Sequence, residues 1–295
     1  MSPETAVVNI QGQYQIYTEF HHAEGAEKTI ILVNGSLATT ASFAQTVRYL
    51  YPHFNVVLYD QPYAGQSKPH NRHDRPISKE DEAFILLELI EHFAAEHVMS
   101  FSWGGAAALL ALAYQPRRLE KAVITSFSAQ VNTAMRGYLE QGVRFLGACD
   151  RPAVGNLING TIGKHLPSLF KRFNHRHIIS LAAHEYAQMH CHVSEVLSQD
   201  DKCYLRYADA IQVPLLFVNG ELDEYTCTED ARLFTGHARE CHFSTIANAG
   251  HFLDMEHKAA WLATQQATLG FLRESLPARR TTHTTLLLEP QAMAS

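Results

Sequence analysis

A serine lies between a strand-like segment and an apolar, helix-like segment near residue 100. Residues 98–105 read Val-Met-Ser-Phe-Ser-Trp-Gly-Gly, so Ser102 is the centre of a Ser-x-Ser-x-Gly pattern. This is a near match to the Gly-x-Ser-x-Gly turn, which exposes a nucleophilic serine at the end of a strand. The turn requires small residues two positions before and after the serine; Gly104 meets this fully and Ser100 less well. Ser102 is therefore the candidate nucleophile.

Two further residues could activate this serine. A serine hydroxyl attacks only when a histidine accepts its proton and a carboxylate orients the histidine. Asp223 and His251 each follow a strand-like segment, at the sheet edge where ligands bind in parallel sheets. The order Ser, Asp, His along the chain is that of α/β-hydrolase triads. The sequence thus predicts a triad of Ser102, Asp223 and His251.

Other carboxylates lie near the predicted acid. Glu221, Glu224 and Asp230 are close to Asp223 in the chain, and Glu224 is the nearest alternative. In the non-catalytic interpretation, His251 is a buried core residue and Asp223 caps a helix.

An acyl-transfer site also needs hydrogen-bond donors for the oxyanion, and backbone amides usually supply them. The amide of Trp103, directly after the nucleophile, is the first candidate. The second should follow an early strand, where the sequence reads Asn-Gly-Ser-Leu; we expect the Ser36 amide, with Leu37 as the alternative. Asn34 stands where related enzymes carry histidine, and the role of its side chain is left open.

Strand-length apolar runs alternate with helical patterns along the chain, which favours a mostly parallel sheet with helices on both faces. After an expected hairpin, the predicted strands are 29–34, 55–60, 98–101, 122–127, 214–219 and 243–246. The predicted helices are 42–51, 79–95, 105–114, 228–236 and 258–275. This arrangement would bring the ends of the serine, aspartate and histidine strands to one edge.

The spacing of these elements is uneven in one place. About 90 residues separate the strands at 122–127 and 214–219, far more than a crossover requires. We therefore expect a helical lid at 129–210, inserted into a core formed by 1–128 and 211–276. Residues 277–295 show no core pattern and are expected to form a mobile tail.

Composition excludes several function classes. The 295 residues include 24 Lys and Arg against 30 Asp and Glu, a formal charge of −6, which disfavours nucleic-acid binding. No signal-peptide pattern or run long enough to span a bilayer is present, so we expect a cytoplasmic protein without a membrane span. Five cysteines without a Cys-x-x-Cys pair indicate free thiols.

Metal and nucleotide cofactors are also disfavoured. The expected lid holds six histidines, but they lack metal-ligand spacing. His177 would begin a His-x4-Asp box, yet Ala182 occupies the fifth position after it. Glycines are isolated and form no phosphate-binding loop. We expect no metal and no bound cofactor.

One basic stretch stands out in this acidic chain. Residues 151–184 contain five Lys or Arg and not one Asp or Glu. The simplest interpretation is a solvated basic face. A docking surface is the functional alternative, with an acidic acyl carrier protein or the phosphates of coenzyme A as the partner. The candidate docking residues are Lys164, Lys171, Arg172 and Arg176.

Four segments together resemble a known family: residues 32–43 (LVNGSLATTASF), 54–62 (FNVVLYDQP), 102–105 (SWGG) and 250–254 (GHFLD). They are similar to the (R)-3-hydroxyacyl-acyl-carrier-protein:coenzyme A transacylases of pseudomonads. A more distant similarity connects them to the 3-(3-hydroxyalkanoyloxy)alkanoate synthases of rhamnolipid synthesis. The likeness extends to about residue 276.

This resemblance implies an α/β-hydrolase fold and a triad at Ser102, Asp223 and His251. It also implies transfer of a medium-chain (R)-3-hydroxyacyl group from acyl carrier protein to coenzyme A, through an acyl-serine, for polyhydroxyalkanoate synthesis. The acceptor could instead be water, in a thioesterase, or a second hydroxyacyl chain, in a synthase. A non-catalytic acyl-binding protein is the remaining alternative, and the oligomeric state is not assigned.

Overall fold

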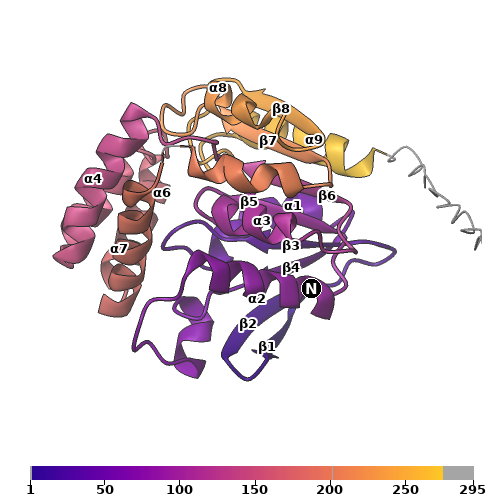
Figure 1. Ribbon diagram of the computed structural model, residues 1–295, viewed down its shortest axis with the longest axis horizontal. Coiled ribbons are helices and arrows are strands. Elements are labelled where there is room, and N and C mark those ends of the chain that lie inside the picture. The colour runs from indigo at the N-terminus through magenta and orange to yellow at the C-terminus, as the bar shows by residue number, and fades with distance from the viewer. Residues whose placement is uncertain (1, 201, 275–295) are drawn as a thin grey trace, which may run out of the picture.

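One mixed sheet forms the centre of the molecule in the computed structural model, which describes residues 2–200 and 202–274 (Figure 1). Its eight strands have the order β1-β2-β4-β3-β5-β6-β7-β8. The first two strands and the β2–β4 pair are antiparallel, and all later pairs are parallel. The strands are β1 Glu4–Ile10, β2 Tyr14–His21, β3 Thr29–Val33, β4 Asn55–Tyr59, β5 His97–Phe101, β6 Lys121–Thr125, β7 Leu215–Gly220 and β8 Cys241–Ile246.

Helices cover both faces of this sheet, as the alternation of patterns predicted. One face carries α2 Lys79–His92, α3 Gly104–Ala113 and α8 Thr228–Ala231, and the other carries α1 Ala44–Leu50 and α9 Lys258–Arg273. Strand β3 shows why: Ile31 and Val33 join one core cluster, while Ile30 and Leu32 join the other. Residues of a strand alternate between faces, so a doubly covered strand is apolar throughout.

Some element ends differ from the sequence-based expectations. The strand expected to reach residue 127 ends at Thr125, because Ser126 has a positive φ of 51° that an extended strand does not accept. The helix expected at 42–51 begins with a 3-10 turn, Thr40–Phe43, and the helix expected at 228–236 ends in another, Arg232–Phe234. The helix expected at 258–275 ends at Arg273, and the tail expected at 277–295 lies outside the described residues.

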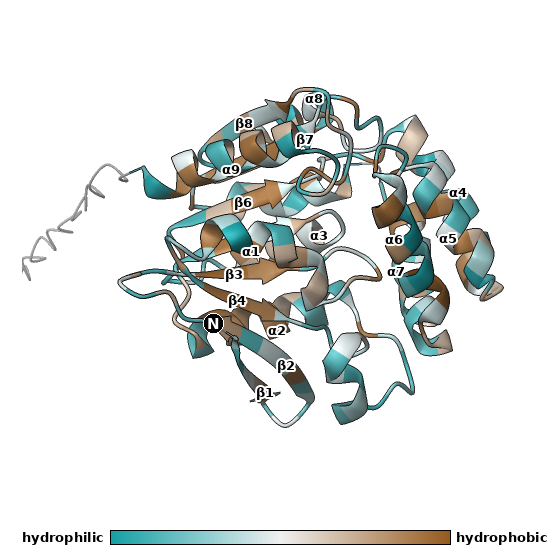
Figure 2. Ribbon diagram, turned by 180° about the vertical axis from the view of Figure 1, so that it is seen from behind, coloured by the Kyte–Doolittle hydropathy of each residue, from teal (hydrophilic) through white to brown (hydrophobic). Residues whose placement is uncertain are grey.

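Four helices between β6 and β7 form a separate layer: α4 Thr133–Gly147, α5 Arg151–Gly160, α6 Ser168–Ser180 and α7 Ala183–Ser198. A 3-10 helix, Cys203–Ala210, leads back to the sheet. We call these residues, 129–210, the helical insertion. Its helices lie beyond the carboxyl ends of the parallel strands (Figure 2) and share their own apolar cluster. The insertion therefore faces the sheet edge where active sites form.

Polar contacts fasten one side of the helical insertion to the core. Gln188 of α7 exchanges two hydrogen bonds of 2.9 Å with the backbone of Ile77. Beside them, Lys68 forms a 2.8 Å ion pair with the buried Glu185. These contacts fix α7 in position over the sheet edge. Across the described ranges, no helix is long and apolar enough to cross a membrane.

Candidate active site

Ser102 lies at the sharp turn between β5 and α3. Its φ is +50°, in the left-handed region, and its amide donates to the Thr125 carbonyl at 2.8 Å. A Cβ at Gly104 would come within 2.4 Å of the Asn34 carbonyl oxygen, so only glycine fits there. Ser100, at the other close position, is fully buried. The turn thus has the strained geometry that presents a nucleophile.

The three residues predicted as a triad form one continuous hydrogen-bonded chain. His251 Nε2 lies 2.8 Å from Ser102 Oγ, and His251 Nδ1 lies 2.7 Å from Asp223 Oδ2. Both His251 and Asp223 are buried. With Nδ1 donating to the carboxylate, Nε2 is left as the acceptor for the serine proton, which is the arrangement that nucleophilic catalysis requires.

Asp223 is held in its charged form by its surroundings. Its oxygens accept hydrogen bonds from the Thr226 hydroxyl at 2.5 Å and from the amides of Tyr225 and Thr226 at 3.0 and 3.2 Å. Burial by itself would raise the pKa of this carboxyl, but His251 and these donors outweigh burial and lower the pKa to about 2. A permanent negative charge therefore faces His251 at neutral pH.

The alternative acids have other partners. Glu221 accepts from the Asn248 amide at 2.8 Å, Glu224 pairs with Lys164, and Asp230 bonds two side chains near the start of α4. No hydrogen bond joins any of the three to His251 within the described part of the chain. The geometry thus favours Asp223 among the carboxylates that the sequence offered.

Sequence reasoning missed the groups that hold the histidine loop. The buried Glu256 accepts from the amides of Gly250 and Phe252 at 2.7 and 3.0 Å, on both sides of His251. Ser126 Oγ donates to the His251 carbonyl at 2.6 Å. A carboxylate five residues after a candidate histidine, in a loop too short for a helix, was the available signal for Glu256.

The predicted oxyanion-hole amides are free to donate hydrogen bonds to a ligand. Within the described residues, the amides of Ser36, Leu37 and Trp103 have no hydrogen-bond acceptor. Leu37 has a φ of +55°, so the loop after β3 turns sharply at this point. The Asn34 side chain is occupied instead, donating to the Tyr59 carbonyl at 3.1 Å and accepting from Ser42 Oγ at 2.8 Å. Asn34 therefore braces the loop.

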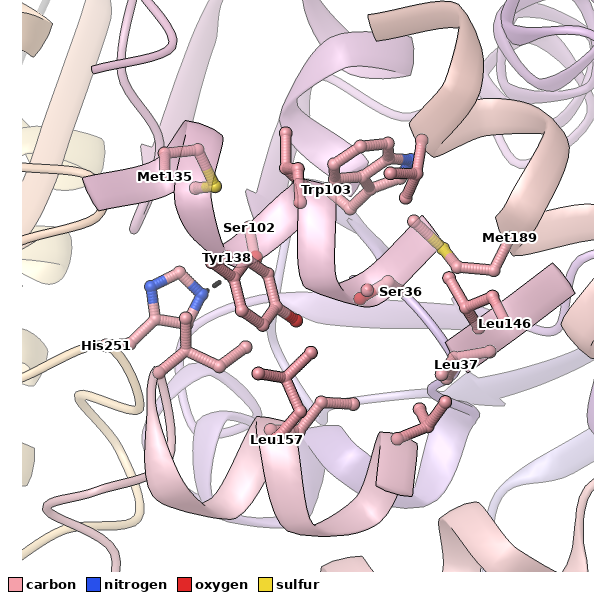
Figure 3. A pocket seen from close by; sticks show the side chains of 16 residues that line it. Ser36, Leu37, Ser102, Trp103, Met135, Tyr138, Leu146, Leu157, Met189 and His251 are labelled. Atoms are coloured by element: carbon pink, nitrogen blue, oxygen red, sulfur yellow. Dashed lines mark hydrogen bonds between the residues drawn. The ribbon is translucent and has the colours of Figure 1, made fainter. Parts of the chain in front are cut away.

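Two cavities meet at Ser102 and His251. The first has apolar walls from α4, α5 and α7 of the helical insertion (Figure 3). The second, which is larger, lies between the loop after β3 and helix α6. Ser36 and Leu37 line both cavities. A substrate could thus extend an apolar tail to one side of the nucleophile and a second group to the other.

The histidines of the helical insertion are dispersed. His177 Nε2 contacts the Leu37 carbonyl at 2.7 Å, His184 stacks on His73 with ring centroids 3.9 Å apart, and His192 is buried beside Gln188. Over residues 2–200 and 202–274, no group of three or more His, Cys, Asp or Glu side chains could hold a metal ion.

The four candidate docking residues are not equivalent. Lys164 forms a 2.8 Å ion pair with Glu224, and Lys171 Nζ donates to the Lys164 carbonyl at 2.7 Å. Arg172 and Arg176 are exposed one turn apart on α6, and neither has an ion pair among the described residues. Two basic side chains on α6 are thus available to a partner.

Comparison with known proteins agrees with this geometry. The family model described as the alpha/beta hydrolase fold matches residues 28–258. The (R)-3-hydroxydecanoyl-ACP:CoA transacylase of Ectopseudomonas oleovorans is 64% identical over 276 residues, 94% of each chain. The protein of that name from Pseudomonas aeruginosa is 62% identical over 92% of this chain and 91% of its own.

Solved structures share the fold at much lower identity. An alpha/beta hydrolase from a deep-sea metagenome library superposes with a TM-score of 0.77 at 17% identity, covering 93% of this chain and all of that one. The enol-lactonase of Burkholderia xenovorans gives 0.75 at 16% identity, over 91% of this chain and all of its own. The expectation of this fold is confirmed. The chain belongs to the α/β-hydrolase family, and within it to the group of the (R)-3-hydroxydecanoyl-ACP:CoA transacylases.

Proposed function

We propose that this protein transfers a medium-chain (R)-3-hydroxyacyl group from acyl carrier protein to coenzyme A. The observation that carries the proposal is the hydrogen-bonded chain from Asp223 through His251 to Ser102, placed where an apolar cavity and an open cavity meet. Relatives at 62–64% identity bear the name of this activity. The product would supply polyhydroxyalkanoate synthesis, as the family resemblance implies.

The first half-reaction forms an ester on Ser102. His251 Nε2 accepts the hydroxyl proton as Oγ attacks the thioester carbonyl, and the amides of Trp103 and Ser36, or Leu37, stabilise the oxyanion. Collapse of the tetrahedral intermediate breaks the C–S bond. The carrier's thiolate leaves and takes the proton from His251.

The second half-reaction repeats these steps with a new thiol. Coenzyme A gives its proton to His251 Nε2, and its sulfur attacks the ester carbonyl. Ser102 Oγ leaves and recovers the proton. One thioester is exchanged for another, so coenzyme A acts as a substrate and no bound cofactor is needed.

Transfer in place of hydrolysis requires that water be kept from the acyl-serine. The helical insertion supports this role, because α4, α5 and α7 form the walls of the apolar cavity beside Ser102. Contacts of Gln188 with Ile77 and of Glu185 with Lys68 attach α7, one of these walls, to the core. We therefore assign residues 129–210 the role of a lid.

The carrier protein would dock on α6. Arg172 and Arg176 are exposed there, and Leu169 and Phe173, 50% and 52% exposed, lie beside them. Phe173 also lines the open cavity, so this surface adjoins an entrance to Ser102. A basic and apolar helix face fits an acidic carrier protein.

Product analysis tests the proposed acceptor. The protein is incubated with 3-hydroxydecanoyl carrier protein, with and without coenzyme A, and the products are identified by mass spectrometry. We expect 3-hydroxydecanoyl-CoA only when coenzyme A is present, and no product from Ser102→Ala. Equal release of free acid in both mixtures would identify a thioesterase, and formation of a dimeric hydroxyacid would identify a synthase. Absence of labelling of Ser102 by a fluorophosphonate probe would favour a non-catalytic acyl-binding protein.

A further inference from the structure

Helix α4 presents one continuous face to the apolar cavity. Its lining residues are Met135, Tyr138, Leu139, Gly142 and Leu146. Their spacing of three and four residues places them in one row along the helix. Eight residues separate Tyr138 from Leu146, a distance of about 12 Å along the axis. An acyl chain attached to Ser102 can thus lie along α4.

The amino-terminal end of this row is close to the triad. The Tyr138 ring packs edge-on against Tyr225, with centroids 5.7 Å apart. The Tyr225 amide in turn donates to Asp223. The cap residue of the helix, Asn132, also reaches the Glu224 carbonyl at 3.1 Å. Tyr138 is therefore fixed at the catalytic end of the cavity, where the first carbons of an acyl chain would lie.

Tyr138 brings a hydroxyl group into walls that are otherwise mostly apolar. Figure 3 shows its oxygen pointing toward the middle of the lining side chains. No hydrogen bond to this oxygen is found in the described part of the chain. Burial raises the pKa of the hydroxyl well above its ordinary value, so it stays a neutral donor. Tyr138 is half-buried and lines the cavity, so its hydroxyl, which has no partner among the described residues, is available to bond a ligand there.

The other polar groups of the cavity are less suitable. Ser102 and His251 are engaged in the reaction itself. The indole nitrogen of Trp103 is on the side of its ring turned away from Ser102 (Figure 3). Ser36 belongs to the loop after β3, and its amide is a candidate donor to the oxyanion. Tyr138 remains as the group placed to meet a substituent near the start of the acyl chain.

We propose that the Tyr138 hydroxyl hydrogen-bonds the 3-hydroxyl of the acyl group and thereby selects hydroxylated over unsubstituted chains. The inference rests on the proposed function, because it assumes acylation of Ser102 by a 3-hydroxyacyl thioester. A site built to bond a hydroxyl rejects an analogue without one, since its own polar group is then left unpaired. Tyr138 is a specificity residue and takes no part in proton transfer.

Acylation of Ser102 can be timed with two donors, 3-hydroxydecanoyl and decanoyl carrier protein, by rapid quench and intact-mass analysis. The wild-type protein should be acylated faster by the hydroxylated donor. Tyr138→Phe keeps the ring against Tyr225, and we expect it to lower that preference about tenfold or more. Tyr204→Phe is the matched control, because Tyr204 packs at the edge of the same apolar cluster but does not line the cavity.

The outcomes separate the inference from the proposed function. If neither donor acylates the wild-type protein, the proposed function fails. If the wild-type protein prefers the hydroxylated donor and Tyr138→Phe keeps that preference, or slows both donors equally, the role of Tyr138 is refuted. Loss of discrimination between the R and S forms of the 3-hydroxyl in Tyr138→Phe would support it further.

Discussion

Replacing Gly142 with leucine should shorten the apolar cavity without weakening the helix that carries it. Gly142 lies inside α4 and faces the cavity. A Cβ built there meets Leu157 Cδ2 at 3.8 Å, an ordinary contact, so the backbone accepts a side chain. Glycine in a helix interior costs about 1 kcal/mol relative to good helix formers, so the variant should fold at least as stably.

The substitution should lower kcat/KM only for long acyl chains. A leucine side chain extending into the cavity displaces about four methylenes of the substrate, each worth about 0.8 kcal/mol when buried. The sum of about 3 kcal/mol corresponds to about a hundredfold loss in kcat/KM for a chain that previously filled the cavity. Chains short enough to end before Gly142 should react as before.

The assay compares kcat/KM for 3-hydroxydecanoyl and 3-hydroxyhexanoyl carrier protein in both proteins. Gly137→Leu is the matched control, because Gly137 lies on the same helix, has nothing within 4 Å of a built Cβ and does not line the cavity. We expect the ratio of kcat/KM between the two chain lengths to change only in Gly142→Leu. An equal loss of kcat/KM for both chain lengths, or the same change in Gly137→Leu, would show that α4 does not determine the length of acyl chain that the cavity accepts.

Three further predictions concern the surroundings of the site. Burial raises the pKa of Asp254 from 3.8 to about 6, although hydrogen bonds from Thr46 and Tyr49 act to lower it. The free energy of unfolding of the wild-type protein should therefore fall as the pH rises from 3.8 to about 6. The free energy of unfolding of Asp254→Asn should therefore exceed that of the wild type by about 2 to 3 kcal/mol above pH 6, and should equal it below about pH 4. A difference in urea unfolding that does not depend on pH would contradict this. Glu256→Gln can accept from only one of two amides and should lower kcat about tenfold at unchanged KM, whereas a change in KM alone would argue against a positioning role. The double variant Arg172→Glu and Arg176→Glu should raise KM for carrier-protein substrates several-fold at low salt, and an unchanged KM would exclude this docking face.

Much of the site could be predicted because its residues stand at strand ends. Ser102, Asp223 and His251 each follow an apolar run, and the parallel arrangement of those runs brings their ends to one edge. The choice of Asp223 as the triad carboxylate required the three-dimensional structure, since chain position alone does not show that Glu224 pairs with Lys164.

The rest depended on packing between distant segments. Whether α4 faces the cavity with Tyr138 and Gly142 is set by how the insertion sits on the sheet, which periodicity does not determine. The basic stretch shows a similar limit. All four predicted docking residues have the same charge in the sequence, yet Lys164 and Lys171 have partners within the chain while Arg172 and Arg176 are exposed.

The central claim is that Ser102 carries the acyl group between two thiols. The most direct test is a single-turnover experiment in which the protein is mixed with 3-hydroxydecanoyl carrier protein, its mass is measured, and coenzyme A is then added. We predict a mass increase of one 3-hydroxydecanoyl group on the peptide that contains Ser102, and its loss as 3-hydroxydecanoyl-CoA appears. Coenzyme A ester formation without any acylated protein, or an undiminished adduct in Ser102→Ala, would contradict the account.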